Sequence, residues 1–142
     1  MVRILWSGLT VGLLLNVLGW IGNVFVLGPM WQEAFAGVTT TSWRDSPWRD
    51  VISLVPDFIY GIAICWLYTA LAARYGASFA TALLASALVF VVGAFTTYLG
   101  IANSGLLPWD LAAATTLLAF VVFLPGAWLV DRLMRGHVSV TK

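Results

Sequence analysis

The stretch ILWSGLTVGLLLNVLGWIGNVFVLG, residues 4–28, decides the fold class. It is apolar almost throughout and contains no charged residue. An α-helix needs about 20 such residues to cross a hydrocarbon core of about 30 Å. The apolar core of a secretory signal is shorter, about 7–15 residues. We therefore interpret this stretch as a retained transmembrane helix.

Further apolar stretches of similar length follow it and predict an all-α membrane protein with four transmembrane helices. Of the 142 residues, 61% are hydrophobic and 9% are charged, whereas about 25% are charged in a soluble domain. We expect one domain with helices at about 4–28, 47–73, 78–102 and 107–132, and an interfacial outer loop at 29–51. The tight turns at 74–76 and 103–105 make consecutive helices neighbours in an antiparallel bundle.

The distribution of basic residues predicts the orientation in the membrane. With both termini in the cytoplasm, five basic residues lie inside and two, Arg44 and Arg49, lie outside. This bias agrees with the positive-inside rule and favours an N-in, C-in protein of a bacterial inner membrane. Five carboxylates then fall toward the outer side: Glu33, Asp45, Asp50, Asp57 and Asp110.

A stripe of small and amide residues runs along the first predicted helix. Its members recur every three or four positions, which places them on one helix face: Gly8, Gly12, Asn16, Gly19 and Asn23. Small residues let another helix approach closely, and asparagine can hydrogen-bond across the contact. The stripe predicts a helix-packing interface, either with the other helices of this chain or with a partner protein or a second copy.

The loop after the first helix contains a short repeat, Trp43-Arg44-Asp45 and Trp48-Arg49-Asp50. Ser46-Pro47 between the two copies is typical of a helix start. Tryptophan next to charged side chains suits the headgroup zone of a membrane, so the repeat predicts an interfacial segment. The alternative is a docking segment for an extramembrane partner, formed by Trp43, Arg44, Trp48 and Arg49.

Asp57 is the most informative ionisable residue because it falls inside a predicted span, directly after Pro56. Intramembrane carboxylates are costly and usually face a bundle interior or a wet cavity. Counting along the helices places several polar residues at a similar depth, which predicts an outer-face polar cluster of Asn23, Asp57, Tyr98, Asn103 and Asp110. In the simpler alternative, Asp57 and Asp110 stabilise helix starts, since each closely follows a proline.

The sequence offers few groups for catalysis or cofactor binding. We expect no histidine, lysine, arginine or glutamate inside a span, because His137 is the one histidine and follows the last predicted helix. This excludes a bis-histidine haem and a retinal-type lysine in the spans, and no metal or nucleophile motif is present. We expect no enzymatic activity, no cofactor and no metal. The net charge of +1 argues against a nucleic-acid partner, and Cys65 fits a buried structural position.

In pattern the chain resembles a group of uncharacterised four-helix bacterial membrane proteins of similar length. The likeness covers most of the chain and rests on three short motifs: Gly8, Gly12 and Asn16; Trp66-Leu67-Tyr68; and Gly126-Ala127-Trp128-Leu129. The resemblance implies a four-helix membrane fold, and no function carries over from it.

Two functions fit these observations. The first is a non-catalytic integral membrane subunit that packs against other membrane proteins or itself, surrounded by membrane lipid, such as an accessory subunit of a respiratory or photosynthetic complex. The second is a small solute or lipid transporter, or binding protein, with a polar vestibule at the outer face. The subunit hypothesis requires a protein contact at the stripe or at residues 43–48, and the transporter hypothesis requires a cavity that reaches Asp57.

Overall fold

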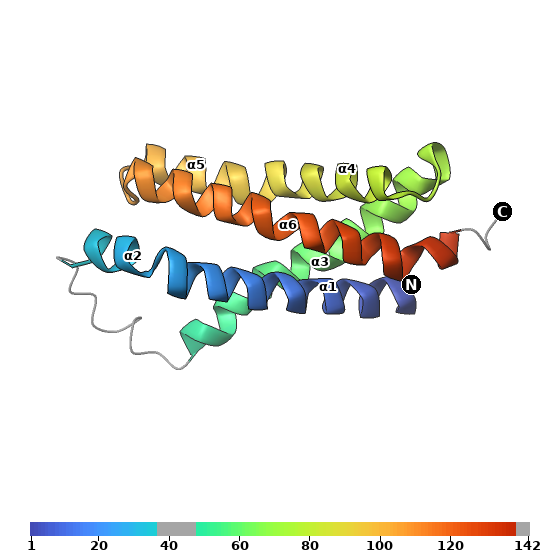
Figure 1. The fold of residues 1–142 in the computed structure, drawn as a ribbon, viewed down its shortest axis with the longest axis horizontal. Coiled ribbons are helices and arrows are strands. Elements are labelled where there is room, and N and C mark those ends of the chain that lie inside the picture. The colour runs from blue at the N-terminus through green and yellow to red at the C-terminus, as the bar shows by residue number, and fades with distance from the viewer. Residues whose placement is uncertain (37–47, 139–142) are drawn as a thin grey trace.

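A computed structural model describes residues 1–36 and 48–138, without the side chains of 49–50 and 137–138. Every regular element in these ranges is helical (Figure 1). The elements in chain order are α1 (Val2–Ile21), the π-helical turn η1 (Gly22–Val26), α2 (Gly28–Ala34), α3 (Trp48–Tyr75), α4 (Phe79–Phe90), the π-helical turn η2 (Val91–Phe95), α5 (Thr96–Asn103) and α6 (Trp109–Val138).

Within the described residues, four continuous helical segments are long and apolar enough to cross a membrane: Val2–Val26, Val51–Tyr75, Phe79–Asn103 and Trp109–Gly136. Their surfaces expose many large apolar side chains, among them Leu13, Val92 and Leu117. Lipid is the solvent that suits such a surface, because helices satisfy their own backbone hydrogen bonds. The predicted multi-pass, all-helical membrane protein is confirmed at this level.

The start of α1 and the end of α6 lie at the same end of the bundle, which we call the terminal end (Figure 1). The Arg3 guanidinium joins them by donating a hydrogen bond from Nη2 to the Leu133 carbonyl oxygen at 2.9 Å. We call the opposite end the α2 end. Two glycines with positive φ, Gly76 at 83° and Gly105 at 75°, reverse the chain between spans, a conformation that glycine adopts without a Cβ penalty.

The short helix α2 lies in the segment that was predicted as a loop. Pro29 occupies its first turn, where the missing backbone donor has no helical partner to lose. Side chains of α2, including Trp31 and Phe35, pack against a small buried cluster around Leu107 and Leu111. This contact holds α2 over the ends of α5 and α6.

A close crossing joins α1 to α3 and uses three glycines. A Cβ added to Gly8 would lie 2.5 Å from the Ile62 Cα, and one added to Gly12 would lie 2.6 Å from the Phe58 Cα. Gly61 faces both glycines from α3, so that a Cβ there would collide with the Gly8 carbonyl oxygen. The backbones can touch because side chains are absent on both sides.

The packed core lies mainly between this crossing and the terminal end. In α3, no residue from Val51 to Tyr60 is buried, whereas Ile64, Cys65 and Tyr68 are fully buried. They pack with Val130 and Met134 of α6, which are buried as well. Figure 1 shows why: the first half of α3 diverges from the other helices toward the α2 end. The space left there contains the candidate site.

Candidate functional site

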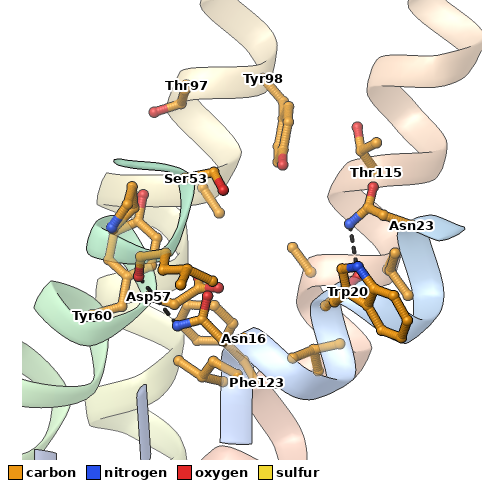
Figure 2. Close-up of a pocket in the computed structure, with 18 residues that line it drawn as sticks. Asn16, Trp20, Asn23, Ser53, Asp57, Tyr60, Thr97, Tyr98, Thr115 and Phe123 are labelled. Carbon is orange, nitrogen blue, oxygen red and sulfur yellow. Dashed lines mark hydrogen bonds between the residues drawn. The ribbon is translucent and has the colours of Figure 1, made fainter. Parts of the chain in front are cut away.

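The four spans surround a cavity of about 490 Å³ toward the α2 end. This volume is in the range of small-molecule sites, about 300–1,000 Å³. All four spans contribute polar groups to its wall (Figure 2): Asn16, Asn23, Ser53, Asp57, Tyr60, Thr97, Tyr98 and Thr115. The rest of the lining is apolar: Leu15, Gly19, Trp20, Leu54, Pro56, Ala94, Leu118, Ala119, Val122 and Phe123.

The cavity begins where the α1–α3 crossing ends. A Cβ added to Gly12 meets the backbone of α3, but a Cβ added to Gly19, two turns further along α1, meets nothing within 4 Å. Asn16 marks the boundary, since its Nδ2 donates to the Gly12 carbonyl oxygen at 3.0 Å and to the Leu54 carbonyl oxygen at 3.2 Å. The bond to Leu54 ties α1 to α3 at the last level at which the two helices are close.

Both π-helical turns border the cavity. Asn23 belongs to η1 and Ala94 to η2, and both line the wall. In η1 the Leu27 amide donates to the Gly22 carbonyl oxygen, five residues back, at 3.0 Å. Such turns are rare and occur frequently at functional sites. Two of them at one cavity therefore single out this part of the bundle.

The turn η2 also makes room for the Tyr60 ring. A Cβ added to Gly93 would lie 2.6 Å from the ring atom Cε1 of Tyr60. The other side of the Tyr60 ring faces Phe123, with a centroid distance of 5.9 Å. Phe123 is itself held by an edge-on contact with Phe90 at 5.6 Å. These contacts fix two aromatic side chains in the cavity wall.

Asp57 brings the one charged group to this lining. It lies six residues after Val51, the start of its candidate span, or about 9 Å along the helix. Within residues 1–36 and 48–138, its carboxylate has neither an ion pair nor a hydrogen bond. Figure 2 shows Asp57 and Tyr60 along one wall, Asn23 and Thr115 on the opposite side, and Tyr98 pointing between them from α5.

Other polar groups of the wall already have partners in the chain. The Asn23 Nδ2 donates to the Gly19 carbonyl oxygen at 2.9 Å, and its Oδ1 accepts from the Trp31 indole at 3.0 Å. The Thr115 hydroxyl donates to the Leu111 carbonyl oxygen at 2.8 Å. Asp57 differs from them because its carboxylate faces the cavity without a compensating group.

The predicted polar cluster is brought together only in part. Asn23, Asp57 and Tyr98 line the cavity, while Asn103 and Asp110 are exposed and do not. The Asp110 carboxylate accepts a hydrogen bond from the Leu111 amide at 2.9 Å at the start of α6. This is the geometry of the helix-start alternative for Asp110.

The predicted stripe divides at Asn16. Gly8, Gly12 and Asn16 pack against α3 inside the chain, whereas Gly19 and Asn23 line the cavity. Gly19 makes no close contact within this chain, because α3 has diverged from α1 at that level, and its packing against a partner stays a prediction. In the predicted docking segment, Trp48 begins α3 and is exposed. Trp43, Arg44 and the side chain of Arg49 lie outside the described residues.

Sequence reasoning missed three aromatic side chains of the wall: Trp20, Tyr60 and Phe123. The spacing of Asp57 and Tyr60 was an available signal, because residues three apart share a helix face. Trp20 and Asn23 have the same spacing.

It also missed Asp131, which is buried at 4% exposure near the terminal end. Its carboxylate forms an ion pair with Arg135 and accepts a hydrogen bond from the Tyr68 hydroxyl at 3.4 Å. The helix α6 continues to Val138, so the candidate span includes Arg132 and Arg135. The candidate spans also include Arg3 and Arg74, so the prediction that they contain no arginine is wrong. At the end of α6, the aspartate–arginine pair four apart supports another helical turn.

Comparisons with family models, curated proteins and solved structures give no match for this chain. In the described part of the chain, no group of three or more histidine, cysteine, aspartate or glutamate side chains is placed to hold a metal ion.

Proposed function

We propose that this chain is a membrane protein that binds a small monovalent cationic solute in the cavity, as a binding protein or transporter. One observation carries the proposal: the Asp57 carboxylate lies within a candidate span, on the wall of a cavity of about 490 Å³, without a partner among the described residues. Intramembrane carboxylates in such positions typically mark ion or substrate sites.

The energetics explain why a cation should enter. A carboxylate withdrawn from water loses solvation that costs several kcal/mol unless an opposite charge or hydrogen bonds replace it. Among the described side chains, the cavity lining supplies no lysine, arginine or histidine for this purpose. A bound cation would supply the missing positive charge. The affinity of the site for that cation would come from its attraction to the unpaired Asp57 carboxylate.

The orientation completes the proposal. With consecutive helices antiparallel and both termini in the cytoplasm of a bacterial cell, the terminal end faces inward and the cavity lies in the outer half of the inner membrane. The packed core then closes the cytoplasmic side. A solute would reach Asp57 from the outer leaflet or the outer aqueous phase.

The accessory-subunit hypothesis has less support from the geometry. The helix α3 of the same chain packs against Gly8 and Gly12, so this part of the stripe offers no free surface to a partner. The exposed Trp48 is still available for a protein contact.

The test is cation-dependent thermal stability of the detergent-purified protein. A ligand at one hundred times its Kd should stabilise the wild type by about 2.7 kcal/mol, and Asp57→Asn should abolish this response because an amide carries no charge. Gly19→Leu should also abolish it by filling the cavity. Gly100→Leu is the matched control, because Gly100 likewise has nothing within 4 Å of an added Cβ but is not part of the lining.

Equal responses of wild type, Asp57→Asn and Gly19→Leu to every cation would contradict the proposal. A response lost equally in Gly19→Leu and Gly100→Leu would indicate a general effect of leucine on the fold, and Asp57→Asn would then decide alone.

A further inference from the structure

We infer that the ligand is an organic ammonium ion with apolar substituents, and not a metal ion; this inference rests on the proposed function and names its substrate class. It follows from the charge, the aromatic rings and the apolar area that the cavity presents together.

The charge of the lining favours one positive charge on the ligand. Asp57 is the one carboxylate that the described side chains bring to the lining, so a monovalent cation neutralises their charge. A divalent ion such as Ca²⁺ prefers six to eight oxygen ligands. A nearby amide oxygen is already engaged, because Asn23 Oδ1 accepts a hydrogen bond from the Trp31 indole.

Aromatic side chains make up much of the wall. Each of the four spans contributes one ring to the cavity that Asp57 lines: Trp20, Tyr60, Tyr98 and Phe123 (Figure 2). Ring faces attract cations, and quaternary ammonium ions in particular are recognised by cages of several aromatic rings. Rings combined with a single carboxylate therefore favour a bulky ammonium ion over a small hydrated ion.

The remaining lining is apolar and belongs mainly to α1 and α6. Leu15 of α1 and Leu118 and Val122 of α6 are among these apolar side chains. A hydrated inorganic ion would leave these side chains against water, whereas alkyl or aryl substituents would cover them. The volume of about 490 Å³ accommodates an ammonium group together with such substituents.

Two of the rings are held in place before a ligand arrives. Tyr60 lies in the notch that Gly93 leaves open, and Phe123 contacts both Tyr60 and Phe90. Trp20 is more accessible, with 61% of its surface exposed, and it contacts Phe25 edge-on at 6.0 Å. The accessible ring is therefore the one whose replacement should disturb binding without disturbing the core.

The experiment measures binding of benzyltrimethylammonium to the purified protein in detergent by isothermal titration calorimetry, with sodium as the inorganic competitor. We expect Asp57→Asn to weaken binding at least about tenfold, as loss of a charge partner does in interfaces. Trp20→Leu should weaken it roughly 2- to 30-fold, the range of one cation–π contact. A large excess of sodium should not compete.

Trp66→Leu is the matched control, because Trp66 is also 61% exposed but does not line the cavity. Its affinity should equal that of the wild type. Tyr98→Leu is a second aromatic variant from another helix, and it should resemble Trp20→Leu.

Each other outcome overturns the inference in a distinct way. If sodium stabilises the wild type but not Asp57→Asn and benzyltrimethylammonium does not bind, the ligand is an inorganic cation and only the proposed function stands. If benzyltrimethylammonium binds wild type and Asp57→Asn equally, or if Trp20→Leu and Tyr98→Leu are both unchanged, the aromatic cation site is wrong. If no cation gives an Asp57-dependent response, both this inference and the proposed function fail.

Discussion

Replacing Gly12 by alanine should destabilise the fold. The change adds only a single methyl group, and alanine has a higher intrinsic helix propensity than glycine. The new Cβ would lie 2.6 Å from the Phe58 Cα and 2.9 Å from the Asp57 carbonyl oxygen, whereas carbon atoms pack best at about 3.5–4.0 Å. The two helices would have to separate by about 1 Å at the crossing, because backbone atoms cannot rotate away as a side chain can.

Such overpacking costs about 1–3 kcal/mol, and we expect the upper part of this range because both obstacles are backbone atoms. The measurement is the free energy of unfolding in detergent, from denaturant titration or thermal scans. Gly100→Ala is the control, since an added Cβ there meets nothing within 4 Å. It should be stabilised by about 0.4–1 kcal/mol through the lower entropy of its unfolded chain. Equal stability of the two alanine variants would refute the close crossing.

Three further outcomes are expected. Ser86→Ala should raise the free energy of unfolding by about 1 kcal/mol, because the buried Ser86 Oγ has no hydrogen-bond partner among the described residues; a lower value in the same denaturant titration would show that the hydroxyl is satisfied. Tyr68→Phe should lower the free energy of unfolding by about 1 kcal/mol, since the Tyr68 hydroxyl donates to the buried Asp131. If the two groups interact, the double variant with Asp131→Asn should lose less stability than the two single variants lose together. Thr40→Cys in a Cys65→Ala background should react with an impermeant thiol reagent from the periplasmic side of intact membranes, and labelling from the cytoplasmic side alone would reverse the proposed orientation.

The fold class could be predicted because hydrophobic length is a local property of the sequence. A run of about 20 apolar residues has one common outcome in a membrane, and each predicted run overlaps a candidate span over most of its length. The helix ends were harder to predict. Polar residues such as Asp131 and Arg135 suggest that the last helix has stopped, but their ion pair lets α6 continue to Val138.

For the site, the sequence could predict only how deep each residue lies in the membrane. Counting residues gives the level of a side chain along a helix and not the direction in which it points. Asn23, Asp57 and Tyr98 have both the correct depth and the correct direction. Asn103 and Asp110 were placed by depth alone, and the structure exposes them. Direction depends on how α3 diverges and on the two π-helical turns, which no local pattern specified.

The stripe on the first helix shows the same limit. Regular spacing correctly places its members on one face, but the identity of the opposing surface changes along that face. Gly8 and Gly12 meet α3, whereas Gly19 meets open space. Along such a face, a small residue either lets two helices touch or leaves space for a cavity. The position at which one role gives way to the other depends on the angle between the two helices, which is a property of the whole bundle.

The two π-helical turns have a consequence for how such a cavity can change over generations. A π turn holds one residue more than an α turn, so deleting one residue from η2 would let the α-helix run on and rotate α5 relative to α4 by about 100°. Tyr98 would then leave the wall, while α4 and the packed terminal end would keep their positions. An equivalent deletion in η1 would re-aim Asn23 and carry α2 around with it. A one-residue insertion or deletion can thus exchange the groups that meet a ligand while the supporting core stays intact. The α2 end of the bundle can therefore change its cavity-lining residues while the terminal end keeps its packing.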